Sequence, residues 1–349
     1  MNKEIPKKNV RDIFYRVDGG ANIGMGHIYR GDILAGCLKN YNILFLLKED
    51  EFGQKKLESM CHKVYRINSS SEKAELDDIE AMASNQKPCL TIIDLLNTSK
   101  HYMERIKTCS SKVLSFENVG GGTRYSDIVI NAVMEGPESS SRFVDGTRYY
   151  TGAAYKVLNE HFEKHLETRP ARKDKNLNVL ISFGGSDPDL FTLKAAKALD
   201  PLRERVNLKI VLGSAFSGEK ELQKGLEKLN LTYQIKKDVE NMAELMWWAD
   251  IAVIAGGGSS LYEIARMGTP GVVMSKVEHQ VINARRFARL GTVIDLGYGY
   301  ECSEEVITSA VERLLSDKEL RQEMSEKGRQ LVDGNGRKRV LEIIEGVMG

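Results

Sequence analysis

The regular alternation of short apolar runs with longer helical patterns constrains the fold of this chain more than any other feature. Residues 13–17 and 90–94 have the length and composition of buried strands, and helical patterns follow them. Strand, helix and strand in repetition predict an α/β fold, with a parallel sheet covered by helices on both faces. The alternation breaks at residues 160–176 and restarts at residues 179–183.

The break at residues 160–176 is charged, contains Pro170 and has few apolar residues, as expected of a helix end and a linker. Because 349 residues exceed one ordinary core, we expect two doubly wound domains of similar size. Two such domains face each other across a cleft at the carboxyl ends of their strands. The expected boundaries are 1–165 for the N-terminal domain, 166–176 for the linker, 177–330 for the C-terminal domain, and 331–349 for a helix that packs back on the N-terminal domain.

The composition of the chain limits the classes of molecule that we expect it to bind. Lys and Arg number 50 against 49 Asp and Glu, so no basic field favours nucleic acid. No apolar run approaches the length of a membrane span, and the polar start does not resemble a signal peptide. The five cysteines show no C-x-x-C spacing, as expected of free thiols in a reducing compartment. We expect a cytoplasmic protein without membrane insertion, whose partner is a small molecule.

Three strand-to-helix turns are rich in glycine, at residues 19–27, 184–187 and 256–260. Glycine lets the backbone approach a ligand closely, and the helix N-terminus beyond supplies free N–H groups for phosphate. The third turn is the best expected diphosphate seat, because the Ser259 and Ser260 hydroxyls add donors. Glu263 follows one helical turn later and could accept hydrogen bonds from the two ribose hydroxyls.

Other interpretations of these turns fit less well. A Walker A loop ends in Gly-Lys-Ser/Thr, which is absent, and Gly24-Met25-Gly26 lacks the third glycine of a dinucleotide fingerprint. Any one turn alone is equally well explained as a tight turn, but three at matching strand ends favour ligand binding. His161 and His165 have a spacing that two zinc ligands use, yet no third ligand is evident, so we expect no metal.

The chain resembles a known family along most of its length. The matching residues begin with Arg16-Val17-Asp18, Ile23-Gly24-Met25-Gly26-His27 and Arg30, and end with 255–260, Glu263, Gly268 and Gln280. They resemble the UDP-sugar hydrolases of the pseudaminic-acid pathway (PseG) and the related spore-coat polysaccharide proteins.

The resemblance implies a glycosyltransferase-B fold and metal-independent, cofactor-free hydrolysis of a UDP-linked diacetamido-trideoxy sugar at the anomeric carbon, with inversion. His27 would be the general base, with Asp18 or Asp94 orienting its ring, and Gly257 to Ser260 would seat the diphosphate. The expected substrate-binding residues are Arg16, Gly24, Gly26, Arg30, Asn97, Tyr155, Gly184, Gly185, Gly257, Gly258, Ser259, Ser260, Glu263, His279 and Gln280.

The sugar side departs from the family pattern. Leu95-Leu96-Asn97 replaces a His-Tyr pair, Glu117-Asn118 replaces Asp-Asp, and His279-Gln280 replaces Asn-Gln. These changes leave the identity of the sugar and of the acceptor open. Three functions are therefore carried forward: a UDP-sugar hydrolase, a glycosyltransferase that uses a UDP-sugar, and an inactive nucleotide-sugar-binding protein.

Overall fold

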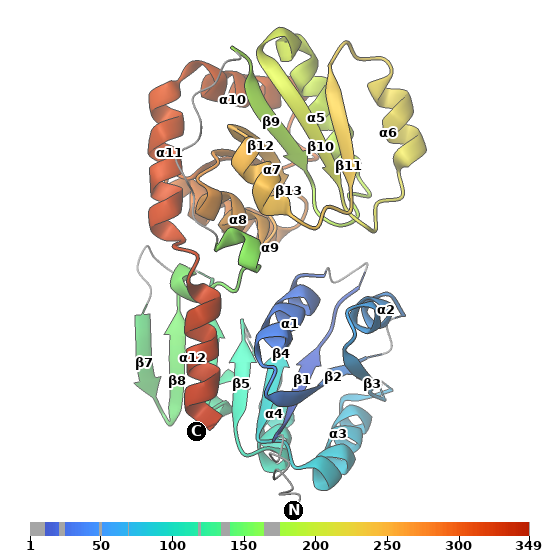
Figure 1. Cartoon of the computed structure of the whole chain (residues 1–349), viewed down its shortest axis with the longest axis vertical. Coiled ribbons are helices and arrows are strands. Elements are labelled where there is room, and N and C mark those ends of the chain that lie inside the picture. Colours follow the sequence, from blue (N-terminus) through green and yellow to red (C-terminus); the bar gives the residue numbers. More distant parts are fainter. Residues whose placement is uncertain are drawn as a thin grey trace, which may run out of the picture. The chain divides into compact units, whose positions relative to one another are not determined.

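The structure, a computed structural model, describes residues 11–20, 25–48, 51–68, 70–117, 120–133, 140–163 and 175–348. The chain forms two compact units (Figure 1). Unit 1 consists of Met1–Val157 and Arg337–Gly349, and unit 2 consists of Leu158–Gly336. The division therefore falls before the expected boundary at residue 165, and most of the expected linker lies outside the described residues.

Unit 1 contains an eight-stranded sheet with the order β3-β2-β1-β4-β5-β6-β8-β7, parallel except for the pairing of β7 with β8. The alternation of strands and helices predicted from the sequence is confirmed up to β6. The elements are β1 Arg11–Val17, α1 Gly26–Cys37, β2 Tyr41–Leu47, α2 Glu51–Ser59, β3 Lys63–Arg66, α3 Glu72–Gln86, β4 Leu90–Asp94, α4 Lys100–Cys109, β5 Val113–Phe116, β6 Ile128–Asn131, β7 Ser140–Val144, β8 Thr147–Thr151 and α12 Gly336–Met348.

Both faces of the central strands β1, β4 and β5 are buried, which explains their continuous apolar runs. Alternate residues of β1 belong to different cores: Ile13 lies in one cluster, while Phe14 lies in the cluster that includes α3 and α4. The cluster of Ile13 also contains Val340 and Ile344 from α12, the red helix of unit 1 in Figure 1. The last helix of the chain is therefore part of the core of unit 1.

The β7–β8 hairpin was not expected from the sequence. Asp145 and Gly146 connect the two strands, and both have positive φ values, 48° and 85°. An Asp-Gly pair in this conformation forms a two-residue hairpin turn whose twist matches that of the strands. The residues of β7 are all exposed, so the apolar pattern that revealed the other strands is missing there.

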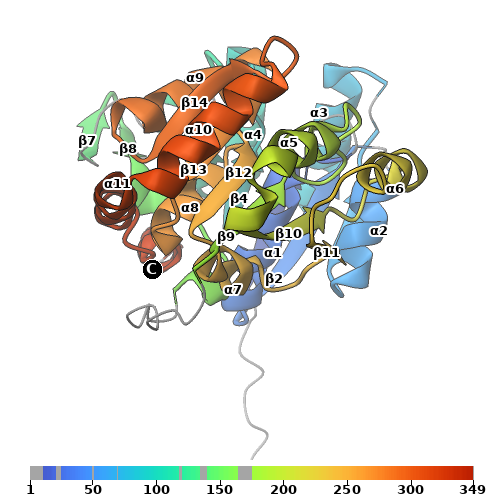
Figure 2. The same ribbon diagram turned by 90° about the horizontal axis from the view of Figure 1, so that it is seen from above.

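Unit 2 contains a six-stranded parallel sheet with the order β11-β10-β9-β12-β13-β14. Helices α5 and α10 lie in front of this sheet when it is seen from above (Figure 2). The elements are β9 Leu177–Ser182, α5 Phe191–Leu199, β10 Val206–Leu212, α6 Glu219–Leu226, β11 Tyr233–Lys237, α7 Met242–Trp248, β12 Ile251–Ala255, α8 Ser260–Met267, β13 Gly271–Ser275, α9 Glu278–Arg289, β14 Val293–Tyr298, α10 Glu304–Ser316 and α11 Lys318–Leu331.

The start of unit 2 explains why the division falls early. Glu160–Phe162 form a single 3₁₀ turn rather than the end of an α-helix. Phe162 is buried, and its carbonyl accepts a hydrogen bond from Nε of Arg266 at 2.8 Å. These contacts hold residues 158–163 in unit 2, whereas the boundary expected from the sequence places them in the first domain.

Strand order reverses once in each sheet, between β1 and β4 in unit 1 and between β9 and β12 in unit 2. Parallel α/β sheets bind ligands at such switch points, beyond the carboxyl ends of the strands. His27 and the turns at 184–187 and 256–260 follow β1, β9 and β12, three of the four strands that flank these points.

Candidate active site

The centre of the site in unit 1 is a pair formed by His27 and Asp94. His27 lies in the first turn of α1, and Asp94 ends β4. Nδ1 of His27 lies 2.5 Å from Oδ1 of Asp94. A lone pair on Nδ1 would be repelled by the carboxylate at this distance, so Nδ1 carries the hydrogen and donates it. In the neutral ring, this tautomer leaves the lone pair on Nε2, and the His27 side chain is 22% exposed.

Asp94 is buried, and two further side chains donate hydrogen bonds to its carboxylate. The hydroxyl of Tyr15 donates to Oδ2 at 2.8 Å, and Arg30 donates from Nε to Oδ2 at 2.8 Å and from Nη2 to Oδ1 at 2.6 Å. Burial alone would raise the pKa of Asp94, but the Arg30 charge, followed by hydrogen bonds from Arg30 and His27, holds it well below its ordinary value. Asp94 is therefore a carboxylate at neutral pH.

A second carboxylate lies behind Arg30. Nη1 of Arg30 lies 2.9 Å from Oε2 of Glu117, and Nζ of Lys156 lies 3.5 Å from Oε1 of the same carboxylate. Burial would raise the pKa of Glu117, but Arg30 and then Lys156 lower it to about 2. Tyr15, Glu117 and Lys156 were not predicted as site residues. Glu117 directly follows β5, the strand next to β4, which Asp94 ends. This position at the carboxyl end of a strand near the switch point is the feature that could have indicated Glu117 from the sequence.

Asp18 forms no hydrogen bond or ion pair with His27 within the described residues; it accepts two hydrogen bonds from Arg16. Nη1 of Arg16 donates to Oδ1 at 2.6 Å and Nη2 to Oδ2 at 2.9 Å, while Nε donates to Glu75 at 2.7 Å. Arg16 is fully buried. The guanidinium groups of Arg16 and Arg30, which were expected to bind substrate, are both held by carboxylates within unit 1. We therefore propose internal roles for Asp18, Arg16 and Arg30.

The remaining predicted residues of unit 1 are spread more widely. Asn97 is exposed beyond the end of β4, and Gly26 begins α1 with open space where a Cβ would project. Tyr155 packs edge-on against Tyr150, with ring centroids 5.3 Å apart, and lines a cavity of about 590 Å³ beside α12. Gly24 lies outside the described residues.

The turn at 256–260 in unit 2 joins β12 to α8 and exposes its backbone. A Cβ on Gly256 would lie 2.3 Å from Oγ of Ser275 and 2.8 Å from the carbonyl oxygen of Gln280, so only glycine fits. A Cβ on Gly257 or Gly258 would meet nothing within 4 Å. The turn is therefore packed underneath at Gly256 and open at the next two residues.

Two hydroxyl groups at this turn are available to a ligand, and a third lies buried beneath it. Within the described part of the chain, the hydroxyls of Ser259 and Ser260 form no hydrogen bond, and α8 has no side-chain cap. The hydroxyl of Ser275 is buried beneath Gly256 and has no partner among the described residues. Free N–H groups at a helix start together with unpaired hydroxyls suit an anionic oxygen ligand.

The turn after β9 is also open. Gly184 has a φ of 77°, and a Cβ on Gly184 or Gly185 would meet nothing within 4 Å. The carbonyl of Gly185 accepts from the Ala215 amide at 3.0 Å, while Asp187 accepts from two amides at the start of α5. The turn is held from behind and leaves its glycines exposed to a ligand.

Glu263 lies in the first turn of α8, as the sequence spacing predicts, and its side chain is partly buried. His279 is exposed near the start of α9. Oε1 of Gln280 accepts a hydrogen bond from the Lys276 amide at 2.9 Å. The side-chain oxygen of Gln280 therefore stabilises the loop between β13 and α9.

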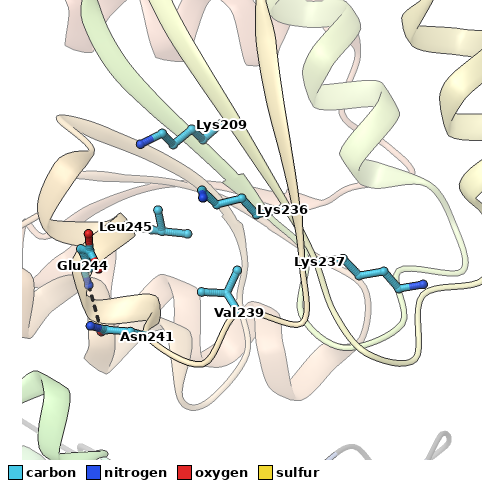
Figure 3. A pocket seen from close by; sticks show the side chains of 7 residues that line it. All are labelled: Lys209, Lys236, Lys237, Val239, Asn241, Glu244 and Leu245. Atoms are coloured by element: carbon cyan, nitrogen blue, oxygen red, sulfur yellow. Dashed lines mark hydrogen bonds between the residues drawn. The ribbon is translucent and has the colours of Figure 1, made fainter.

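A separate basic cavity of about 370 Å³ lies between β10, β11 and α7 (Figure 3). Lys209, Lys236 and Lys237 line it, and none of the predicted site residues does. Nζ of Lys209 lies 3.8 Å from the ring centroid of Trp248, so this tryptophan packs against the sheet.

The described residues offer neither a metal-binding cluster nor a membrane-spanning helix. No group of three or more His, Cys, Asp or Glu side chains among them could hold a metal ion. No helix within the same ranges is long and apolar enough to cross a membrane.

Comparisons with known proteins agree with this architecture. The family model described as "Glycosyltransferase family 28 C-terminal domain" matches residues 156–339. The spore coat polysaccharide biosynthesis protein SpsG of Bacillus subtilis is 34% identical over 335 residues, which cover 94% of this chain and 96% of SpsG.

Two more distant proteins are similar over most of the chain. The UDP-2,4-diacetamido-2,4,6-trideoxy-beta-L-altropyranose hydrolase of Campylobacter jejuni is 23% identical, with 82% of this chain and 99% of the hydrolase covered. The crystal structure of Acinetobacter baumannii MurG superposes with a TM-score of 0.72 at 18% identity, covering 96% of this chain and 99% of MurG. The chain therefore belongs to glycosyltransferase family 28 and has the glycosyltransferase-B fold.

Proposed function

We propose that this protein is an enzyme that hydrolyses a UDP-linked acetamido deoxy sugar at its anomeric carbon and releases UDP and the free sugar. Its family works on nucleotide sugars, and the Campylobacter relative is named as such a hydrolase. The observation that carries the proposal is the 2.5 Å contact between His27 and Asp94, which leaves a basic nitrogen on a partly exposed ring.

His27 would act as the general base. Its Nε2 takes a proton from water, and the water oxygen forms a bond to the anomeric carbon as the bond to the β-phosphate oxygen breaks. UDP leaves with that electron pair, and attack from the opposite side inverts the anomeric centre. Asp94 holds the ring in the required tautomer and stabilises the imidazolium that forms.

Unit 2 would bind the nucleotide through its open turns. The amides after Gly257 and Gly258 and the hydroxyls of Ser259 and Ser260 would donate to the diphosphate, and stabilise the charge that develops on it. Glu263 would accept hydrogen bonds from the ribose hydroxyls. Gly184 and Gly185 would allow a phosphate or the sugar to approach the backbone closely.

The first test is the replacement of His27 by Ala or Asn. Turnover of the best substrate among a panel of UDP-sugars should fall by about 10²–10⁴-fold, because proton transfer to the base is lost. UDP affinity, measured by calorimetry, should change less than about twofold, because the proposed contacts to the nucleotide lie in unit 2. A tenfold change would correspond to about 1.4 kcal/mol of lost binding energy. His101→Asn, an exposed histidine on α4, is the matched control.

Product analysis separates hydrolysis from the other functions. UDP and reducing sugar should both appear without any acceptor. UDP release that requires an organic acceptor would instead indicate a glycosyltransferase, the activity named by the family. Tight UDP-sugar binding with no UDP release would indicate an inactive binding protein. Near-normal rates in both His27 variants would contradict the assignment of the base.

A further inference from the structure

Four side chains of alternating charge lie one after another behind the His27 ring and form a chain of contacts with it. We call these five residues the His27 charge chain: His27, Asp94, Arg30, Glu117 and Lys156. Each contacts the next, at 2.5, 2.6, 2.9 and 3.5 Å. The last four are buried or nearly so, with side chains from 0% to 16% exposed, whereas His27 is 22% exposed.

We propose that Arg30, held in place by Glu117 and Lys156, is a positioning residue that sets how readily His27 releases its proton. The proposal rests on the proposed role of His27 as the base. It assigns to Arg30 a function inside unit 1 in place of the substrate contact that the sequence suggested.

The geometry gives Arg30 two effects on His27. It donates to both oxygens of Asp94, which fixes the carboxylate plane against Nδ1 of the ring. Its Nη2 also lies 3.0 Å from Nδ1 of His27. Because Nδ1 already donates to Asp94, it cannot accept from Arg30, so this contact places a positive charge beside the ring. Asp94 stabilises the imidazolium, and Arg30 limits that stabilisation.

A base must lose the proton that it gains, or the enzyme stops after one turnover. Asp94 alone, buried against the ring, would hold the imidazolium strongly. The Arg30 charge shares the carboxylate and offsets this attraction. The balance lets His27 be oriented by a carboxylate and still return to its neutral form after each reaction.

Among the described residues, the one other titratable side chain that bonds to Asp94 adds no charge near neutral pH. Tyr15, from β1, donates to Asp94, and its pKa is raised well above the ordinary value by burial and then by Asp94. It therefore stays uncharged. Arg30 stacks on the Phe116 ring, 4.9 Å from its centroid, which fixes the guanidinium between the two carboxylates.

Glu117 and Lys156 act on His27 through Arg30. Glu117 attracts Arg30 and reduces its effect on Asp94, whereas Lys156 partly neutralises Glu117. Removal of successive members should therefore shift the protonation of His27 in alternating directions. A purely structural role would not produce this alternation.

The experiment follows the pH at which the His27 ring is half-protonated, in the full-length protein without substrate. Imidazole NMR signals report it, with His27→Asn used to assign the ring. Arg30→Gln should move the midpoint up by about one pH unit, because a like charge a few Å away is lost. Glu117→Gln should move it down by about half a unit, and Lys156→Met should move it up by a smaller amount.

Two further variants serve as controls. Arg30→Lys keeps the charge and should restore most of the wild-type midpoint. Arg105→Gln removes one positive charge from α4, where Arg105 pairs with Asp77 and Glu80, and should leave the midpoint unchanged within about 0.2 units because these two carboxylates and solvent screen its charge. In the pH profile of kcat/KM, the acidic limb should follow the same pattern.

The outcomes separate this inference from the proposed function. If the midpoint alternates as described but no UDP-sugar is turned over, the charge chain stands and the proposed function fails. If turnover is normal while Glu117→Gln and Lys156→Met leave the midpoint unmoved, the inference fails. Should Arg30→Gln not fold, as circular dichroism would reveal, the opposite shifts expected for the other two variants still decide it.

Discussion

Asp94 shows how one buried side chain can connect the core of a sheet to chemistry at its edge. It is the last residue of a strand whose five residues are all buried, and its carboxylate receives donors from β1 and α1. A buried carboxylate is stable only when its oxygens are satisfied. Tyr15 and Arg30 meet this requirement and leave one side of the carboxylate facing His27.

At this scale the two aspartates that the sequence could not distinguish differ in a testable way. Asp94→Asn should lower kcat by about 10²-fold or more, because the amide no longer holds the base tautomer. Asp18→Asn should lower the free energy of unfolding, since Arg16 loses its paired acceptor, but should leave kcat within about threefold because a lost hydrogen bond there does not reach the base. Steady-state kinetics and urea unfolding measure both, and a larger kcat loss in Asp18→Asn would contradict the geometry.

From the sequence, His27 and Asp94 were proposed as catalytic residues, but Glu117 and Lys156 were not expected near them. His27 stands in a glycine-rich turn, a local signal that one chain can show. Arg30, Glu117 and Lys156 come together only because α1 and the segments after β5 and β8 meet at one edge of the sheet. Their contacts span separations that periodicity does not reveal, so Arg30 was assigned to substrate.

The glycine turns are the elements on which nucleotide binding is proposed. Gly256 is fixed by packing against Ser275, whereas Gly257 and Gly258 face open space. One turn therefore combines a residue required by the fold with two whose small size matters only when a ligand approaches. The sequence predicted the turn and the helix after it correctly, because both signals are local. The β7–β8 hairpin was missed, since the exposed strand β7 lacks the apolar pattern of the others.

A pair of glycine replacements tests whether the open glycines of this turn serve ligand binding and not stability. Gly258→Ala should leave the free energy of unfolding unchanged but weaken UDP binding by about tenfold, because the new methyl group occupies ligand space. Gly36→Ala, on an open and exposed site of α1, should raise the free energy of unfolding by about 1 kcal/mol and leave UDP affinity unchanged. Calorimetric UDP titration and urea unfolding give both values. Unchanged UDP binding in Gly258→Ala would place the nucleotide elsewhere.

For the whole molecule, the important feature is that the chain returns to unit 1 after completing unit 2. Helix α11 belongs to unit 2, and α12 supplies Val340, Ile344 and Met348 to the core that contains β1 and β5. The start of α12 is also bonded to unit 1, where Arg339 donates to the Ala154 carbonyl at 3.0 Å. The sequence predicted two α/β domains from strand alternation alone. It could not give the boundary at residue 158, because that depends on how Phe162 packs.

Because the core of unit 1 is completed by the end of the chain, damage to α12 should act on unit 1 alone. Ile344→Ala removes a fully buried side chain and should cost about 2–5 kcal/mol of unfolding free energy. Hydrogen exchange should increase in β1, β4 and β5, while β9 and β12 keep their protection and UDP still binds unit 2. Glu345→Ala, on the exposed side of the same helix, should change neither. Equal loss of protection in both units would mean that they unfold as one cooperative structure, and the separate role of α12 would be wrong.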